Sequence, residues 1–165
     1  MNTDRSQQSG LLQLMAGVLN LLGQLPDSVL LLGCRLAAGA IFFKSALTKI
    51  DTETWVIAPT ETTIGLFRDE YHVPVLPPEI AAYLGTYNEF FMPFLLVLGL
   101  GARLGAAALL GMTFVIQVFV YPENWAEHLS WAVLLAFVLT RGPGQFSVDH
   151  LLAGRFFERQ LRYAR

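Results

Sequence analysis

The sequence has few charged residues, a single cysteine and no excess of basic charge. Lys, Arg, Asp and Glu make up 15% of the 165 residues, whereas hydrophobic residues make up 54%, and the mean hydropathy is +0.49. A soluble domain carries about 25% charged residues, so the shortage of charge indicates a surface that faces lipid. The formal net charge of -2 provides no basic face for a nucleic acid, and we expect no nucleic-acid partner.

The residues that build common catalytic and metal sites are also scarce. Cys34 is the only cysteine, which excludes an intrachain disulfide and a CxxC redox pair. His, Cys, Asp and Glu do not occur at the spacing of a zinc or haem site, and we predict no metal site. The sequence contains no glycine-rich phosphate loop, nucleophile elbow or dinucleotide fingerprint. A standard enzyme motif therefore does not define the function.

Four apolar stretches predict four membrane-spanning helices. They cover, approximately, residues 28–47, 80–100, 104–121 and 125–140. A span needs roughly 20 mainly apolar residues; the first stretch contains Arg35 and Lys44, and the fourth is short unless its polar start lies among lipid headgroups. A soluble bundle is the disfavoured alternative, because the third stretch offers only Thr113 and Gln117 for a polar face. We therefore predict an all-α fold, an integral membrane four-helix bundle.

The positions of the basic residues predict its orientation. The connections at 49–79 and around Glu123 are mainly acidic, whereas the turn after the second stretch contains Arg103. The segment after the fourth stretch contains five arginines: Arg141, Arg155, Arg159, Arg162 and Arg165. Because Lys and Arg favour the cytoplasmic side, we predict a bacterial-type inner-membrane protein with both termini in the cytoplasm.

The chain divides into three predicted regions. Residues 1–27 form a cytoplasmic N-terminus with an interfacial helix, 28–152 form the four-helix domain, and 153–165 form a basic amphipathic tail. Both flanking segments mix apolar and polar positions at helical spacing, which is typical of helices that lie in the membrane interface; packing under the bundle is the alternative. The outer connection is long and is either a lid over a site between the helices or a plain connector.

Ionisable residues at membrane depth are costly and mark candidate sites. Glu89 is the most informative, because it lies mid-span beside Asn88, and because Pro93 deprives the Glu89 carbonyl of its usual helix donor. It is a ligand or proton site, a protonated interhelical hydrogen-bond donor, or the partner of Lys44 in a structural ion pair. We expect Arg35 to reach the cytoplasmic headgroups from the face of the helix opposite Lys44.

Other polar and small residues are weaker candidates. Gln117 is expected to bond neighbouring helices or a ligand, His128 to be an interface residue more than a ligand contact, and Lys49 to be solvated at the outer interface. Small residues predict close helix packing, within or between chains; they are Gly101 and Gly105, in a GxxxG pattern, and Gly111.

Several segments resemble the DoxX family of small four-span membrane proteins. The resemblance rests on RLAAGAIFFKSALTKI at 35–50, the PPE that ends the long connection, Glu89, the turn at 99–105, FVYPENW at 119–125 and RGPGQFSVDHLL at 141–152. The last segment, with Arg141 and Asp149, is the most specific. The family includes a subunit of an archaeal thiosulfate:quinone oxidoreductase, members linked to thiol redox stress, and relatives found with small metal-binding peptides. The resemblance thus implies a redox-associated membrane role, although the chain lacks a cysteine pair for direct thiol chemistry.

Three functional hypotheses follow. The first is a quinone-linked redox subunit, in which Glu89 accepts a proton and Lys44 or Gln117 donates a hydrogen bond to a quinone carbonyl. The second is a transporter or accessory protein for a small solute or metal, with a polar site near the midplane. The third is a non-catalytic membrane scaffold. In each case the lipid bilayer is the immediate partner, and a homo-oligomer or a membrane-protein partner is left open, as is catalysis itself.

Overall fold

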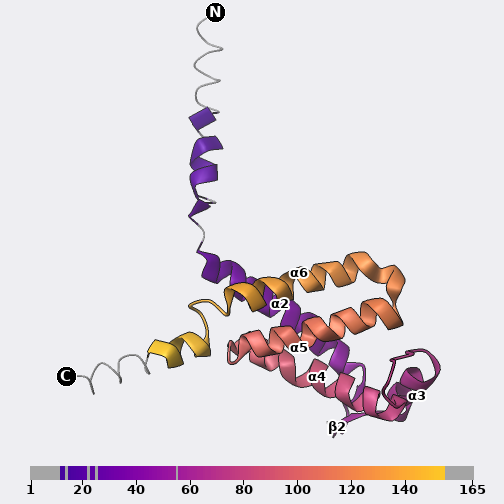
Figure 1. The fold of residues 1–165 in the computed structure, drawn as a ribbon. Coiled ribbons are helices and arrows are strands. Elements are labelled where there is room, and N and C mark those ends of the chain that lie inside the picture. Colours follow the sequence, from indigo (N-terminus) through magenta and orange to yellow (C-terminus); the bar gives the residue numbers. More distant parts are fainter. Residues whose placement is uncertain (1–11, 14, 22, 25, 55, 155–165) are drawn as a thin grey trace, which may run out of the picture.

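The fold is given by a computed structural model that describes residues 12–154, except 14, 22, 25 and 55. Its main elements are α2 (Asp27–Leu47), α4 (Pro78–Leu98), α5 (Ala102–Val115) with its π-helical continuation η1 (Ile116–Val120), and α6 (Trp125–Arg141). Helices α2 and α5 each contact both α4 and α6, so each of the four main helices has two neighbours (Figure 1). The predicted all-α membrane bundle is confirmed at this level.

Three helices are long and apolar enough to cross a membrane. They are Asp27–Leu47, Pro78–Leu98 and Ala102–Val120. The chain is thus a multi-pass membrane protein. Helix α6 has only 17 residues, below the roughly 20 that a span ordinarily needs, so the fourth crossing stays a prediction.

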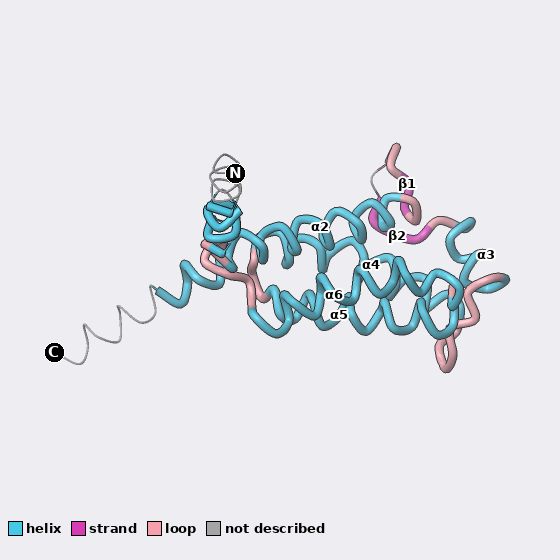
Figure 2. The backbone as a smooth tube through the Cα atoms, turned by 90° about the horizontal axis from the view of Figure 1, so that it is seen from above, coloured by secondary structure: helices cyan, strands magenta, loops and turns pink. Residues whose placement is uncertain are grey.

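The two ends of the bundle differ in structure (Figure 2). At one end, called here the loop end, residues 48–77 connect α2 to α4 through an antiparallel pair, β1 (Ile50–Asp51) and β2 (Val56–Pro59), and helix α3 (Glu61–Asp69). The short 3-10 helix η2 (Pro122–Asn124) lies at this end too. The opposite end, called the arginine end, holds the turn at 99–101 and the segment 142–147. The predicted long loop is therefore a folded unit.

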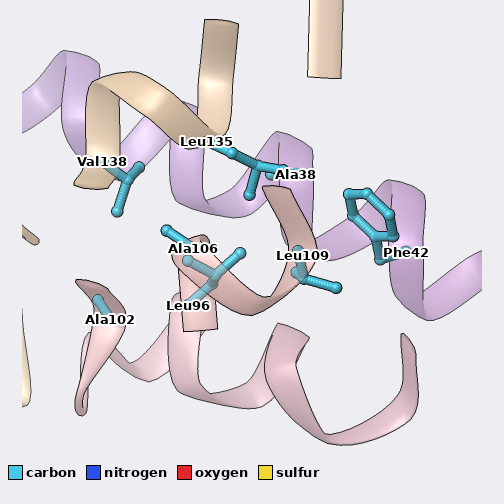
Figure 3. Packing of buried hydrophobic residues seen from close by; sticks show 8 residues of the cluster. All are labelled: Ala38, Phe42, Leu96, Ala102, Ala106, Leu109, Leu135 and Val138. Carbon is cyan, nitrogen blue, oxygen red and sulfur yellow. The ribbon is translucent and has the colours of Figure 1, made fainter. Parts of the chain in front are cut away.

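Small residues allow the helices to approach closely toward the arginine end. The buried cluster there consists of Ala38, Phe42, Leu96, Ala102, Ala106, Leu109, Leu135 and Val138 (Figure 3). Three alanines among the eight bring the backbones together, as in other membrane bundles. The same closeness occurs at Gly39, where an added Cβ would lie 2.8 Å from the Val97 side chain.

The three predicted packing glycines have different surroundings. An added Cβ at Gly105 would lie 3.2 Å from the Met92 carbonyl oxygen and 3.3 Å from Leu95 Cβ, so this glycine is in close contact with α4 of the same chain. At Gly101 and Gly111 an added Cβ would meet no atom within 4 Å. Close packing within the chain is therefore absent at these two glycines among the described residues, and packing between chains stays a prediction. Gly101 has a positive φ of 57° and ends the turn before α5.

Gly105→Leu is expected to destabilise the bundle by about 1–3 kcal/mol, the usual cost of overpacking a close contact, because the new side chain must separate α5 from α4. Gly111→Leu is the matched control, since the same side chain there meets open space. Thermal unfolding in detergent measures both. Equal melting temperatures for Gly105→Leu and the unsubstituted protein would contradict the close contact.

Helical residues before α2 run across the direction of the bundle in both views (Figures 1 and 2). Their exposed apolar side chains include Leu12, Met15, Val18, Leu19 and Leu21. This placement suits the predicted interfacial helix, which stays a prediction. Residues 148–154 are helical as well, while the predicted basic tail lies, from 155 onward, outside the described residues.

Candidate ligand-binding cavity

A cavity of about 740 Å³ occupies the loop-end half of the bundle. All four main helices line it, each with the half nearer the loop end. The lining residues fall within 41–49 of α2 and the turn after it, 81–89 of α4, 111–121 of α5 and η1, and 124–131 of α6 and the residue before it. The packed cluster fills most of the other half. The bundle is therefore hollow at one end and solid at the other.

Aromatic residues close the cavity toward the packed half. Phe42 meets Trp131 edge to face, with ring centroids 5.4 Å apart, and both rings border the cavity. Edge-to-face contact is a favoured aromatic geometry. Because Phe42 also belongs to the buried cluster, this ring pair forms the floor of the cavity.

The connection between α2 and α4 supplies part of the cavity wall. Its contributing side chains are Phe67, Tyr71, Val73 and Leu76. Tyr121, at the end of η1, donates its hydroxyl hydrogen to Glu70 at 2.6 Å and lies 3.2 Å from the Tyr71 hydroxyl. Burial and the Glu70 hydrogen bond raise the pKa of Tyr121 above its ordinary value. The hydroxyl thus stays protonated and ties the connection to the α5–α6 turn.

Glu89 forms a buried ion pair on the cavity wall, but its partner is Lys49. Lys49 Nζ lies 2.7 Å from Glu89 Oε2, and the two side chains are 14% and 3% exposed. Lys49 Nζ also donates to Ser45 Oγ at 3.0 Å. The predicted pairing of Glu89 with Lys44 and the predicted solvated position of Lys49 are therefore wrong.

The direction of the side chains explains why Glu89 pairs with Lys49 and not with Lys44. Ser45, one turn before Lys49, lines the cavity. The backbone N–H groups of Thr48 and Lys49 donate to the last carbonyls of α2, so the chain keeps turning as in the helix and Lys49 lies on the same face as Ser45. Lys44 precedes Ser45 by one residue, or about 100° of helical rotation. Its side chain is exposed at the border of the cavity and makes no ion pair with any residue in the described part of the chain.

Asn88 and Pro93 lie on either side of Glu89 in α4. Asn88 borders the cavity, and its amide nitrogen is 3.4 Å from the Ala108 carbonyl oxygen and 3.3 Å from Met112 Sδ. It therefore links α4 to α5. Pro93 is buried inside α4.

Gln117 and His128 bond to each other across the α5–α6 connection. His128 is only 3% exposed, and its Nδ1 is 2.7 Å from Gln117 Oε1. The Gln117 amide nitrogen donates to the Pro122 carbonyl oxygen at 2.7 Å. Gln117 is thus bonded through both its oxygen and its nitrogen, and it does not line the loop-end cavity. Of the two donors to a quinone carbonyl that the sequence suggested, Lys44 is the one at the cavity. Across residues 12–154, outside the gaps given above, no group of three or more His, Cys, Asp or Glu side chains is arranged to hold a metal ion.

Arg35 does not reach toward headgroups but is buried at the arginine end. It is 1% exposed and donates to four carbonyl oxygens at 2.6–2.8 Å: those of Leu96, Val97, Pro143 and Phe146. The first two belong to the last turn of α4, where carbonyls lack the donor four residues later that a helix interior provides and the helix dipole is negative. These contacts outweigh headgroup solvation, so the snorkelling prediction is wrong.

The segment after α6 closes around Arg35. Gly99 has a φ of +67°, and an added Cβ there would lie 2.5 Å from Ser147 Cβ and 2.7 Å from Arg35 Nη2. Asp149 accepts hydrogen bonds from the Gly101 and Ala102 backbone N–H groups at 2.9 and 3.4 Å, which caps the positive end of α5. Arg141 is exposed, 3.7 Å from Asp27.

These features define a helical multi-pass membrane protein with a cavity at one end and a buried arginine at the other. The family model for DoxX matches residues 30–122, more than half of the chain, and the chain belongs to the DoxX family. No match is found among curated proteins or among solved structures.

Proposed function

We propose that this DoxX-family protein binds a small, partly apolar molecule in the loop-end cavity, and that a quinone is that molecule. One observation carries the proposal: a cavity of about 740 Å³ with a buried Lys49–Glu89 ion pair in a largely apolar wall. Small-molecule sites are typically clefts of about 300–1,000 Å³ that combine apolar walls with a few polar groups. A quinone, with two carbonyls on an apolar ring, matches that combination.

Lys44 and Glu89 are the proposed polar contacts of the ring. Lys44 borders the cavity, and its ammonium is available to a quinone carbonyl. Glu89 is the proposed proton acceptor, because its carboxyl group lies at the cavity wall, where its Oε2 is 2.7 Å from Lys49 Nζ. A redox partner protein would be needed for electron transfer, since the chain has no cysteine pair.

The proposed setting is a bacterial-type inner membrane, crossed four times, with the loop end outside and both termini in the cytoplasm. The basic residues at the arginine end support this orientation. In this setting the cavity receives its ligand from the outer leaflet or the outer aqueous side.

Single cysteines are expected to label according to this topology. In a Cys34→Ala background, Thr62→Cys and Glu123→Cys should react with a membrane-impermeant maleimide on intact cells. Leu100→Cys and Gln145→Cys, which are exposed at the arginine end, should react only after the cells are opened. The opposite pattern would reverse the orientation, and labelling of Glu123→Cys from the same side as Gln145→Cys would remove the fourth crossing.

Mass spectrometry of small molecules that co-purify with the protein tests the ligand. We expect a quinone at near-stoichiometric amount, and its loss in Gly111→Trp. Gly111 borders the cavity, and an added Cβ there meets open space, so the indole fills the cavity without disturbing the packed half. Gly33→Trp is the matched control, because Gly33 is an exposed helical glycine with no neighbour within 4 Å of an added Cβ.

The two other hypotheses give different results in the same preparations. A quinone retained equally by Gly111→Trp and Gly33→Trp would be bound outside the cavity and would contradict the proposal. Solute or metal flux in liposomes that stops in Gly111→Trp would favour transport. A stably co-purified protein, with no small molecule and no flux, would favour the scaffold.

A further inference from the structure

The α6 wall of the cavity contains a buried imidazole that is held by a chain of hydrogen bonds. His128 Nδ1 lies 2.7 Å from Gln117 Oε1, and Gln117 Nε2 lies 2.7 Å from the Pro122 carbonyl oxygen. The His128 ring also packs on Trp131, with centroids 5.0 Å apart. The imidazole is thus fixed both in place and in orientation.

The direction of these two hydrogen bonds determines which ring nitrogen of His128 carries the hydrogen. A backbone carbonyl only accepts hydrogen bonds, so the Gln117 amide must turn its NH₂ group to Pro122. Its oxygen then faces His128 and also only accepts, so Nδ1 must be the donor. In the neutral imidazole, Nε2 is left with a lone pair.

The π-helical turn makes this arrangement possible. Residues 116–120 form η1, with the Tyr121 N–H donating to the Ile116 carbonyl at 2.9 Å. Pro122 follows and has no N–H of its own, which ends the helix. The wider turn brings the Gln117 side chain to the Pro122 carbonyl five residues later. Such π-turns occur frequently at functional sites.

His128 Nε2 has no hydrogen-bond partner among residues whose placement is described. The ring lies between two spaces: the loop-end cavity and a groove of about 440 Å³ between α5 and α6, whose lining includes Phe114 and Leu129. Two polar side chains of the groove wall, Thr113 and Gln117, already bond to Leu109 and Pro122. Trp125 also lines the groove but is 63% exposed, and its indole N–H makes no hydrogen bond to Nε2 in the described part of the chain. The described residues leave Nε2 unpaired but accessible to the space beside the ring, so a molecule bound there can supply the donor.

We infer that the ligand of the cavity donates a hydroxyl hydrogen to His128 Nε2, so that the site selects a phenolic or enolic ring, such as a quinol, over its O-alkylated form. This inference rests on the proposed function and specifies that the cavity prefers the reduced form of the ligand, the quinol. His128 contacts the ligand, Gln117 is a positioning residue, and Lys44 supplies a donor to an oxygen of the same ring. One hydroxyl oxygen can donate to Nε2 while accepting from another group.

The tautomer is tested directly by ¹⁵N NMR of the full-length protein labelled at its three histidines. His128→Asn removes one pair of signals and assigns them. We expect these signals to show a protonated Nδ1 and an unprotonated Nε2 at neutral pH. A hydrogen on Nε2, or a fully protonated ring, would overturn the inference.

Ligand selection is tested with a decyl-substituted benzoquinol, kept reduced under argon, and its di-O-methyl ether. The unsubstituted protein should bind the quinol about tenfold more tightly, the effect of roughly one hydrogen bond. His128→Asn should lose this preference, because asparagine retains a donor near the Nδ1 position but has no atom at Nε2. Gln117→Glu should lose it too, since a carboxylate beside Nδ1 favours a protonated ring whose Nε2 is a donor.

His72→Asn is the matched control and should keep the preference, because His72 is exposed on the connection between α2 and α4. Equal binding of quinol and ether by the unsubstituted protein would overturn the role of His128 and leave the cavity proposal standing. Binding of neither compound would overturn both.

Discussion

Replacing Arg35 with methionine is expected to lower the stability of the bundle by about 3–5 kcal/mol, the range for breaking a buried charged network. The guanidinium donates to four carbonyls from two separate segments, and methionine leaves all four buried without these donors. The loss should appear as a large drop in melting temperature in detergent, together with faster proteolysis after α6.

Two further variants show whether the geometry or the charge is responsible. Arg35→Lys keeps the charge, but a single ammonium cannot reproduce the planar fork of donors, so most of the loss should remain. Arg141→Met removes an exposed pair with Asp27 at 3.7 Å and should change stability by less than about 1 kcal/mol. Full stability of Arg35→Lys would show that charge alone is sufficient.

The second large effect is expected at the ion pair in the cavity wall. Glu89→Gln and Lys49→Met should each destabilise the protein by about 2–4 kcal/mol, because each leaves the other group buried without its counter-charge. The double variant should be more stable than the sum of the single losses predicts, with a coupling energy of at least about 1 kcal/mol. Thermal or denaturant unfolding in micelles measures the stability of the unsubstituted protein, the two single variants and the double variant, which together form a double-mutant cycle.

Lys44→Met is the control for this cycle, since Lys44 is exposed and unpaired among the described residues. It should leave stability within about 0.5 kcal/mol, and it should show no coupling to Glu89→Gln. Additive losses for Glu89 and Lys49, or coupling to Lys44 instead, would contradict the observed pair. Glu89→Gln that folds but retains no quinone would support a role of the carboxylate in binding beyond structure.

The helices were predictable because their signal is local. Three apolar stretches correspond to α2, α4 and α5 with η1, and the proline at 78 and the left-handed glycine at 99 mark the ends of α4. The hairpin and α3 were missed because residues 48–77 are mixed in polarity, and their order depends on contacts with α4 such as Phe67 on Ala81 and Ala82.

The partners of the charged residues were less predictable, although one signal was present. The buried positions of α2 include Ser28, Leu31, Arg35, Ala38, Phe42 and Ala46, repeating every three or four residues. Arg35 belongs to this stripe, and Lys49 continues it, 14 residues or nearly four turns later. Spacing thus distinguishes Lys49 from Lys44, but the carbonyls that receive Arg35 come from more than 60 and 100 residues away and could not be read from the pattern.

That separation has a consequence for synthesis of the protein in the membrane. The Pro143 carbonyl lies 108 residues after Arg35, so at about 5–20 residues per second a ribosome makes it roughly 5–20 seconds later. Until then the guanidinium of α2 lacks half of its final acceptors, and a charge at membrane depth is costly. We expect the nascent α2 to hold Arg35 among the headgroups during this interval and to shift inward when residues 143–146 emerge. Crosslinking from position 35 in stalled chains should therefore change from lipid to protein between chain lengths before and after that segment.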